Sequence, residues 1–258
     1  MPLTGGPLRD TAVMTISVIA VHGNGGGAFR WERLPVPLAR GVELHAITLP
    51  GFAGIPLPSG PASMATFTDA IVAEVEARAE PRVLLGHGIG GALALDAVAH
   101  RPQLVAGLIL HAPVGANLDQ RWFPRIMSAP VIRRLAKAVV ASPLTQRLAG
   151  RRLFADTPPE YGRRFLAEYG RADGFEVMFD LLTSEWFDGL PDTSVPTSIL
   201  WGDRDRILQP SQADDLARRL RHGERRIIEG WGHYPMIEQP ADYATVVAEI
   251  AARLVQGS

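Results

Sequence analysis

Short apolar runs alternate with longer amphipathic segments along the first 110 residues of the chain. Four runs rich in Val, Ile and Leu have the length of β-strands, at 15–21, 42–48, 82–85 and 105–110. The segments between them carry apolar residues at helical spacing, at 29–40, 66–79 and 90–100. Strands and helices that alternate with short connections predict a parallel sheet with helices on both faces.

The alternation stops after residue 113. From about 114 to 192 the pattern favours helices without a convincing strand, at 124–140, 144–153, 159–169 and 175–187. Strand and helix patterns then return at 196–201, 212–221, 225–228 and 241–255. We therefore predict a doubly wound α/β core formed by 1–113 and 193–258, with 114–192 inserted as a helical cap. Residues 1–14 have no regular pattern and are expected to form a loose tail.

The charge balance and the hydropathy exclude several classes of partner. Lys and Arg residues number 26 against 27 Asp and Glu, a formal net charge of -1, so neither nucleic acid nor a membrane is an expected partner. The arginine pairs at 133–134, 151–152 and 163–164 are expected on solvated helix faces. No apolar run approaches the roughly 18 residues that span a bilayer, and the N-terminus lacks the apolar segment of a secretory signal. We expect a soluble, cytoplasmic protein.

The residue composition also limits the chemistry. The chain has no cysteine, which excludes disulfides, thiol catalysis and cysteine-bound metal. The seven histidines are scattered and lack the spacing of a metal site. We therefore expect neither a metal nor an organic cofactor, and the sequence leaves the oligomeric state open.

The stretch Val83–Leu95 combines a strand, a sharp turn and a helix. An apolar run ends at Gly86, and an Ala- and Leu-rich segment begins directly after Gly90. This stretch resembles the nucleophile elbow of the α/β-hydrolase family, in which the sequence G-x-Nu-x-G carries the nucleophile on the turn. The resemblance implies Ser, Cys or Asp at the middle position, where this chain has Gly88. Because acyl-enzyme catalysis needs a side-chain nucleophile, Gly88 dominates the functional question.

Two later stretches resemble the acid and histidine segments of the same family, and they follow the family's chain order. The sequence Gly-Asp-Arg-Asp over 202–205 follows a predicted strand, and the resemblance implies that Asp205 is the acid, with Asp203 as the alternative. The sequence Gly-His-Tyr-Pro-Met-Ile-Glu-Gln-Pro over 232–240 matches the loop of the catalytic histidine, which implies His233 as the base. A carboxylate on the other ring nitrogen would orient that imidazole.

The segment that follows the first predicted strand reads His22-Gly23-Asn24-Gly25. It resembles the H-G-x-G segment of the family. The resemblance implies that the backbone N–H groups of Asn24 and Ile89 form an oxyanion hole, since the glycines allow the backbone to approach a developing negative charge.

Further candidates are side chains that would contact a substrate. His22, His87 and His111 follow predicted strands, and ligands bind at the carboxyl ends of strands in open α/β sheets. The family often has histidine before its nucleophile, so a structural role is equally open for His87. The cap is expected to set the substrate through bulky apolar residues, and those selected as contacts are Trp122, Phe123, Phe179 and Trp186.

A dinucleotide site is the alternative explanation of the same glycines. The sequence Gly-His-Gly-Ile-Gly-Gly over 86–91 matches G-x-G-x-x-G between a strand and a helix. That fingerprint expects an acidic residue at the end of the next strand, and this strand ends in His111. A second match over 23–28 has Glu43 at the start of a strand rather than at its end. Nucleotide binding is therefore disfavoured.

Three interpretations of Gly88 remain open. In the first, Gly88 is an engineered replacement of Ser in a serine hydrolase of a small ester, lactone or β-diketone. In the second, Gly88 is natural and His233 acts with Asp205 alone, either on water or by removing a proton from the substrate. In the third, the protein is a non-catalytic binder that keeps the pocket. The expected ligand is a small, mainly apolar carbonyl compound.

Overall fold

The computed structural model describes residues 14–115, 118, 126–127, 129–150, 153–154, 157–220 and 223–257. The predicted tail lies outside this range except for Met14, which is exposed. Two of the predicted substrate contacts, Trp122 and Phe123, also lie outside the described residues.

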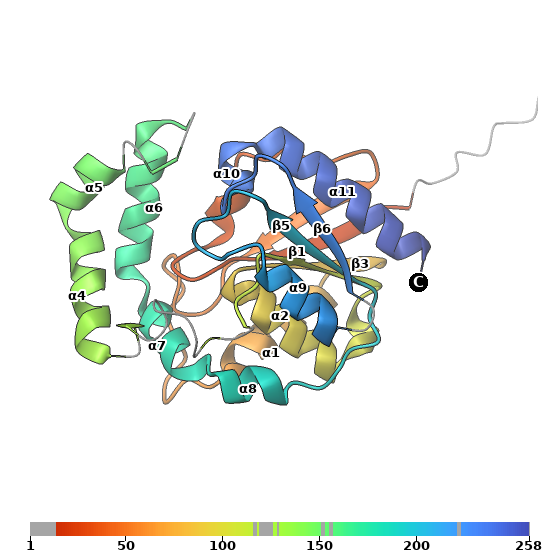
Figure 1. Cartoon of the computed structure of the whole chain (residues 1–258), viewed down its shortest axis with the longest axis horizontal. Helices are drawn as coiled ribbons and strands as arrows, with labels where there is room; N and C mark the ends of the chain where they lie inside the picture. The colour runs from red at the N-terminus through yellow and green to blue at the C-terminus, as the bar shows by residue number, and fades with distance from the viewer. Residues whose placement is uncertain are drawn as a thin grey trace, which may run out of the picture.

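Within the described residues, six strands form one sheet in which every neighbouring pair is parallel (Figure 1). The strands are β1 (Ile16–Val21), β2 (Val42–Ile47), β3 (Arg82–His87), β4 (Gly107–His111), β5 (Thr197–Gly202) and β6 (Gly223–Ile228). Their order across the sheet is β2-β1-β3-β4-β5-β6. The chain therefore runs outward from β1 to β2 and returns on the other side of β1 with β3. The predicted parallel α/β sheet is confirmed.

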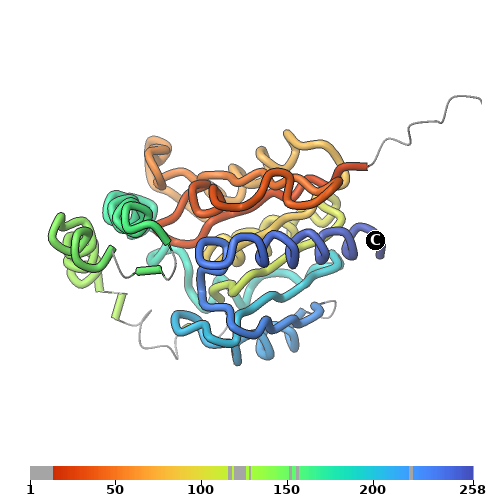
Figure 2. Tube along the Cα trace, turned by 90° about the horizontal axis from the view of Figure 1, so that it is seen from above, coloured from red at the N-terminus to blue at the C-terminus, as the bar shows by residue number. Residues whose placement is uncertain are grey.

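Helices cover both faces of this sheet, as Figure 1 and the view from above in Figure 2 show. One face carries α1 (Met64–Glu76), α2 (Ile89–His100) and α9 (Gln212–Arg219). The other face carries the 3-10 helix η1 (Ala28–Trp31), α10 (Pro235–Glu238) and α11 (Pro240–Gln256). A second 3-10 helix, η2 (Pro102–Leu104), connects α2 to β4.

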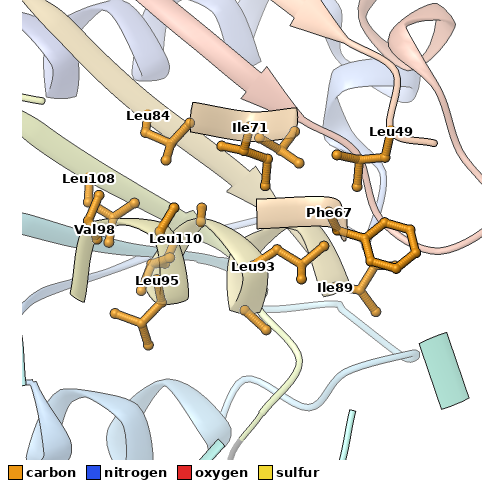
Figure 3. Close-up of a cluster of buried hydrophobic side chains, with 14 of the residues drawn as sticks. Leu49, Phe67, Ile71, Leu84, Ile89, Leu93, Leu95, Val98, Leu108 and Leu110 are labelled. Atoms are coloured by element: carbon orange, nitrogen blue, oxygen red, sulfur yellow. The ribbon is translucent and has the colours of Figure 1, made fainter. Parts of the chain in front are cut away.

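A separate hydrophobic cluster fills the space under each layer of helices. In the first cluster, side chains of α1 and α2 meet those of β3 and β4, among them Phe67, Leu93 and Leu110 (Figure 3). Every residue of α2 from Ile89 to Val98 is buried. A helix that is enclosed on all sides has little freedom to shift, so α2 holds the turn that precedes it in a fixed position.

Five helices and no strand occur in the described part of 114–192. They are α4 (Pro130–Ala141), α5 (Pro143–Ala149), α6 (Pro159–Arg171), α7 (Asp173–Leu181) and α8 (Ser184–Gly189). In Figure 1, α4, α5 and α6 stand beside the sheet at the left, and α7 and α8 return toward α1 and α2. The boundaries of an inserted cap at 114 and 192 stay a prediction. No helix in the described chain is long and apolar enough to cross a bilayer.

The predicted helix over 29–40 is wrong. Only the short helix η1 forms there, and the chain continues through turns. Pro35 and Pro37 explain the difference, because proline lacks the N–H that a helix needs and disfavours helical backbone in the residue before it. The apolar spacing in this segment comes instead from Phe29, Trp31 and Leu34, which are buried in the second hydrophobic cluster.

Two predictions for the inserted segment also need correction. The single helix expected over 175–187 is two helices, because the Thr183 side chain accepts a hydrogen bond from the Trp186 N–H and starts α8 as an N-cap. The Arg133 side chain was expected in solvent, but it is only 3% exposed. Its guanidinium pairs with the Asp180 carboxylate of α7 at 2.7 Å.

Candidate active site

The ends of β1, β3 and β4 lie side by side at one edge of the sheet. The parallel register pairs Val21 with Gly86 and His87 with His111. The residues that follow these strands therefore meet at the carboxyl edge, where α/β sheets bind ligands. The predicted elbow, oxyanion segment and strand-end histidines all come from this edge.

Gly88 has the backbone conformation of a sharp strand-to-helix turn. Its φ of 58° and ψ of -121° lie in a region that favours glycine. Its N–H donates to the His111 carbonyl at 3.1 Å, and its carbonyl accepts from the N–H of Gly91 and of Val114. The turn is therefore bonded to β4 and to the first turn of α2.

The glycines of this elbow differ in why they are glycine. A Cβ at Gly86 would lie 2.4 Å from the Gly90 carbonyl oxygen, and a Cβ at Gly90 would lie 2.5 Å from the carbonyl oxygens of Val21 and His22. At Gly88 the nearest atom to an added Cβ would be the Gly23 Cα at 3.4 Å, an ordinary contact distance. Packing thus requires glycine at 86 and 90, whereas position 88 has room for a side chain.

His233 and Asp205 form a buried hydrogen-bonded pair. The imidazole Nδ1 lies 2.7 Å from Asp205 Oδ2, and the other carboxylate oxygen accepts from the N–H groups of Ile207 and Leu208 at 2.8 Å each. The two residues are 9% and 5% exposed. Because Nδ1–H donates to the carboxylate, Nε2 is left as the basic nitrogen.

The side chain of Asp203, the alternative acid, hydrogen-bonds to another loop and not to His233. Its carboxylate accepts the Gly230 N–H at 2.7 Å, and the residue is exposed. The geometry thus selects Asp205 as the partner of the imidazole.

The predicted oxyanion hole has its two amides unused within the described chain. Neither the Asn24 nor the Ile89 N–H donates to any of the described residues. Ile89 is the first residue of α2, where helix N–H groups lack intrahelical partners. The Arg30 guanidinium donates to the Asn24 carbonyl at 2.8 Å and so fixes the loop that carries this amide.

His22 is a structural residue rather than a substrate contact. Its Nε2 accepts the Leu49 N–H at 3.0 Å, and its Nδ1 donates to the Gly23 carbonyl at 2.8 Å. The ring is fully buried, and this burial lowers the pKa of His22 to about 3. The neutral ring therefore ties the oxyanion segment to the end of β2, and no nitrogen is left for a ligand.

His87 and His111 are also fully buried. This is contrary to the expectation that His111 lines the pocket, and it agrees with a structural role for His87. His87 donates through Nε2 to the His233 carbonyl at 3.0 Å, and its Nδ1 lies 3.4 Å from the Arg30 guanidinium. The Nδ1 of His111 lies 3.2 Å from the Tyr243 hydroxyl. Burial lowers the pKa of His111 to about 3 and that of His87 well below its usual value, so both rings are neutral.

The predicted cap contacts do not gather at the elbow. Phe179 of α7 packs against Phe175, with ring centroids 5.2 Å apart. Trp186 of α8 lines a hollow of about 290 Å³ together with residues of α1 and α2, such as Thr68 and Asp96. Neither His233 nor any other residue of the site lines this hollow, and Trp186 packs partly buried against the first hydrophobic cluster.

The structure adds residues that the sequence analysis missed. The buried Arg30 guanidinium lies over the rings of Phe165 and Tyr234, 5.0 and 5.2 Å from their centroids. Tyr169 of α6 lies against the oxyanion segment, since a Cβ at Gly25 would fall 1.9 Å from its ring. Tyr234 directly follows His233 in sequence, and this neighbourhood could have identified it as a residue of the site. Arg30 had none, because it lay in a segment interpreted as an ordinary helix.

The described residues contain no group of three His, Cys, Asp or Glu side chains that could hold a metal ion.

Comparison with known proteins identifies the class to which this fold and site belong. The sequence model of the Alpha/beta hydrolase family matches residues 18–246, and the chain belongs to that family. A pimeloyl-[acyl-carrier protein] methyl ester esterase from Aromatoleum aromaticum is 25% identical over 260 residues, which cover 90% of this chain and 97% of the relative.

Solved structures agree on the fold. A meta-cleavage product hydrolase from Pseudomonas fluorescens IP01 has a TM-score of 0.67 at 22% identity, covering 92% of this chain and 90% of that one. An epoxide hydrolase from Bacillus megaterium has a TM-score of 0.72 at 14% identity, covering 91% and 92%. Family and relatives together class the chain as a hydrolase with esterase-like relatives.

The packing of the elbow predicts different costs for two alanine substitutions. Gly88→Ala places a methyl group at an ordinary contact distance from the Gly23 Cα and adds mainly backbone strain, about 1–3 kcal/mol. Gly90→Ala pushes a methyl group into two carbonyl oxygens and is expected to cost more than that or to prevent folding. Urea unfolding of both variants measures the difference. If both variants lost the same free energy of unfolding, the assignment of a packing cost to position 90 and a backbone-strain cost to position 88 would be contradicted.

The buried histidines predict a loss of stability in mild acid. Their pKa values lie below the usual 6.5, so the unfolded chain binds more protons, and stability is lost as the pH falls below 6.5 toward 3. From pH 7.5 to 5.5, His22 and His111 together remove about 3 kcal/mol, and His87 acts in the same direction. Urea unfolding at both pH values tests this. His111→Gln should reduce the loss by about 1.4 kcal/mol.

Proposed function

We propose that this protein is a cofactor-independent hydrolase of small, largely apolar esters and related carbonyl compounds, in which a His–Asp dyad activates water. The observation that carries the proposal is the buried 2.7 Å pair of His233 and Asp205 in the same site as an elbow with free space at Gly88. The missing hydroxymethyl group leaves that space open to a water molecule. The esterase relative supports an ester as the substrate.

The proposed reaction needs one base and two amide donors. The Nε2 of His233 takes a proton from water as the water oxygen attacks the substrate carbonyl carbon. The resulting oxyanion accepts hydrogen bonds from the Asn24 and Ile89 N–H groups. The tetrahedral intermediate then expels the alcohol oxygen, which takes the proton back from the imidazolium, and the products are an acid and an alcohol. Asp205 stabilises the imidazolium between the two proton transfers.

The scaffold around the dyad supports this assignment of roles. His87 fixes the His233 carbonyl, and Arg30 fixes the Asn24 carbonyl, so the base and one oxyanion donor are both held through their own backbone. The rings of Phe165, Tyr169 and Tyr234 lie around the guanidinium and the oxyanion segment. These rings favour a mainly apolar substrate.

The first test compares the wild-type protein with Gly88→Ser and His233→Ala on a panel of short aryl esters. The wild type is expected to accelerate hydrolysis by about 10³-fold, the level that an oxyanion hole and binding sustain without a full triad. His233→Ala should abolish this activity. Gly88→Ser should react faster, with a burst of product, and should be labelled by a fluorophosphonate that leaves the wild type unlabelled.

Either of two outcomes would contradict the proposal. If only Gly88→Ser turns over, the site is a serine-hydrolase triad without its nucleophile. If none of the three proteins turns over any ester while the wild type binds the panel, the protein is a binder on this fold.

A second test separates the two aspartates. Asp205→Asn removes the carboxylate that orients His233 and is expected to lower kcat by about 10²-fold or more. The matched change Asp203→Asn removes a carboxylate two residues away that bonds only the Gly230 N–H within the described chain, so kcat should stay within about twofold. The comparison is made in the wild type if it turns over and otherwise in Gly88→Ser. Equal losses would argue against Asp205 as the partner of the base.

A further inference from the structure

Helix α4 has its polar and apolar sides reversed relative to an ordinary surface helix. Its only buried residue is Arg133. Its large aliphatic residues point outward instead, with Val131, Leu135 and Val139 exposed by 74%, 64% and 51%. A surface helix normally buries its apolar face and exposes its charges.

Ion pairs with α7 explain this orientation. Arg133 pairs with Asp180 at 2.7 Å, and Lys137 lies 3.2 Å from Asp173 and 3.6 Å from Glu176. These contacts turn the charged side of α4 toward the rest of the protein. The aliphatic side is left without a partner in the described chain.

The exposed surface continues onto α5, which has no buried residue. We define the α4–α5 apolar face as the seven exposed aliphatic residues Ile126, Val131, Ile132, Leu135, Val139, Leu144 and Leu148. Figure 1 shows α4 and α5 at the far left of the molecule, with α6 between them and the sheet. Single exposed aliphatic residues are ordinary, but six on the consecutive helices α4 and α5, with Ile126 just before them, indicate an interaction surface.

The charge of this segment indicates the kind of partner. Residues 114–152 contain eight Lys and Arg residues and one Asp, a formal net charge of +7, within a chain whose total is -1. The rest of the chain therefore carries a formal net charge of -8. The total of -1 argued against a membrane partner only because it adds a positive segment to a negative remainder. Among the described residues, Arg134 of α4 and Arg147 of α5 are exposed, and the Arg134 guanidinium lies 4.0 Å from the Glu176 carboxylate of α7.

A second copy of the chain fits this face poorly. In a two-fold contact the same patch would face itself, and Arg134 and Arg147 would approach a surface of their own sign. We propose that the α4–α5 apolar face docks on an anionic lipid surface. Its aliphatic side chains enter the headgroup boundary, and the neighbouring cations bind the negative headgroups. The inference is independent of the function proposed above.

Flotation of the whole chain with lipid vesicles tests the proposal. The wild type is expected to float with phosphatidylcholine vesicles that contain 30% phosphatidylglycerol, to float much less with pure phosphatidylcholine, and to be released by 500 mM NaCl. The variant Arg134→Gln/Arg147→Gln should lower the partition coefficient about 30-fold, which corresponds to about 1 kcal/mol for each cation. Leu135→Gln/Leu148→Gln should lower it at least tenfold, because two apolar contacts are lost.

A matched control keeps the test specific. Val36→Gln/Arg40→Gln changes an exposed aliphatic residue and an exposed cation outside the face and should float like the wild type. Circular dichroism shows whether each variant is folded, and the lipid and salt comparisons on the wild type need no variant.

Three results would overturn the proposal. The first is absence of flotation with anionic vesicles, and the second is flotation that the α4–α5 variants do not change. The third is binding of the face to something else. Binding to a second copy would appear as a dimer in sedimentation that Leu135→Gln/Leu148→Gln abolishes. Binding to an acidic protein would appear as capture of soluble polyglutamate without capture of vesicles.

Discussion

The close approach of two backbones at the elbow is the constraint on which the site depends. The first turn of α2 lies so near the end of β1 that Gly90 leaves no room for a Cβ beside the carbonyl oxygens of Val21 and His22. Because α2 is buried along its length, this contact fixes the turn relative to the sheet. The Ile89 amide and the oxyanion segment after β1 are placed by the same contact. One backbone approach thus positions the turn at Gly88 and the Asn24 and Ile89 amides together.

Hydrogen bonds between buried side chains link this backbone contact to the His233 loop. Arg30 holds the Asn24 carbonyl and reaches the Nδ1 of His87, whose Nε2 donates to the His233 carbonyl. This chain of hydrogen bonds joins the oxyanion segment to the loop of the imidazole across β3. Burial keeps His87 uncharged, which avoids a second cation beside the guanidinium. The histidines that cluster here serve position rather than proton transfer, and His233 alone has a carboxylate partner among those at the strand ends.

Local pattern predicted the sheet, and the resemblance of two short loops to the α/β-hydrolase family predicted the His233–Asp205 pair. A parallel sheet brings strand ends together, so residues that directly follow strands meet whatever the rest of the chain does. Side-chain direction in the helical segment does not follow from local pattern. Periodicity places the aliphatic residues of α4 on one side, and the expected side is the buried one. The ion pairs of α4 with Asp180 and its neighbours on α7, distant in sequence, reverse it.

The absence of a side chain at 88 is compatible with an intact elbow because the elbow does not depend on that side chain. The turn is held by the hydrogen bonds of the Gly88 backbone to β4 and α2 and by the packing of the flanking glycines. A nucleophile on this turn would have to adopt a φ of 58°, which costs a side chain strain that glycine avoids. Glycine here therefore lowers the energy of the fold while it removes one catalytic group. Strain at active sites and stability often oppose each other in this way. The geometry of the elbow therefore persists without a side chain at 88, and under the proposed mechanism the dyad beside it carries the chemistry.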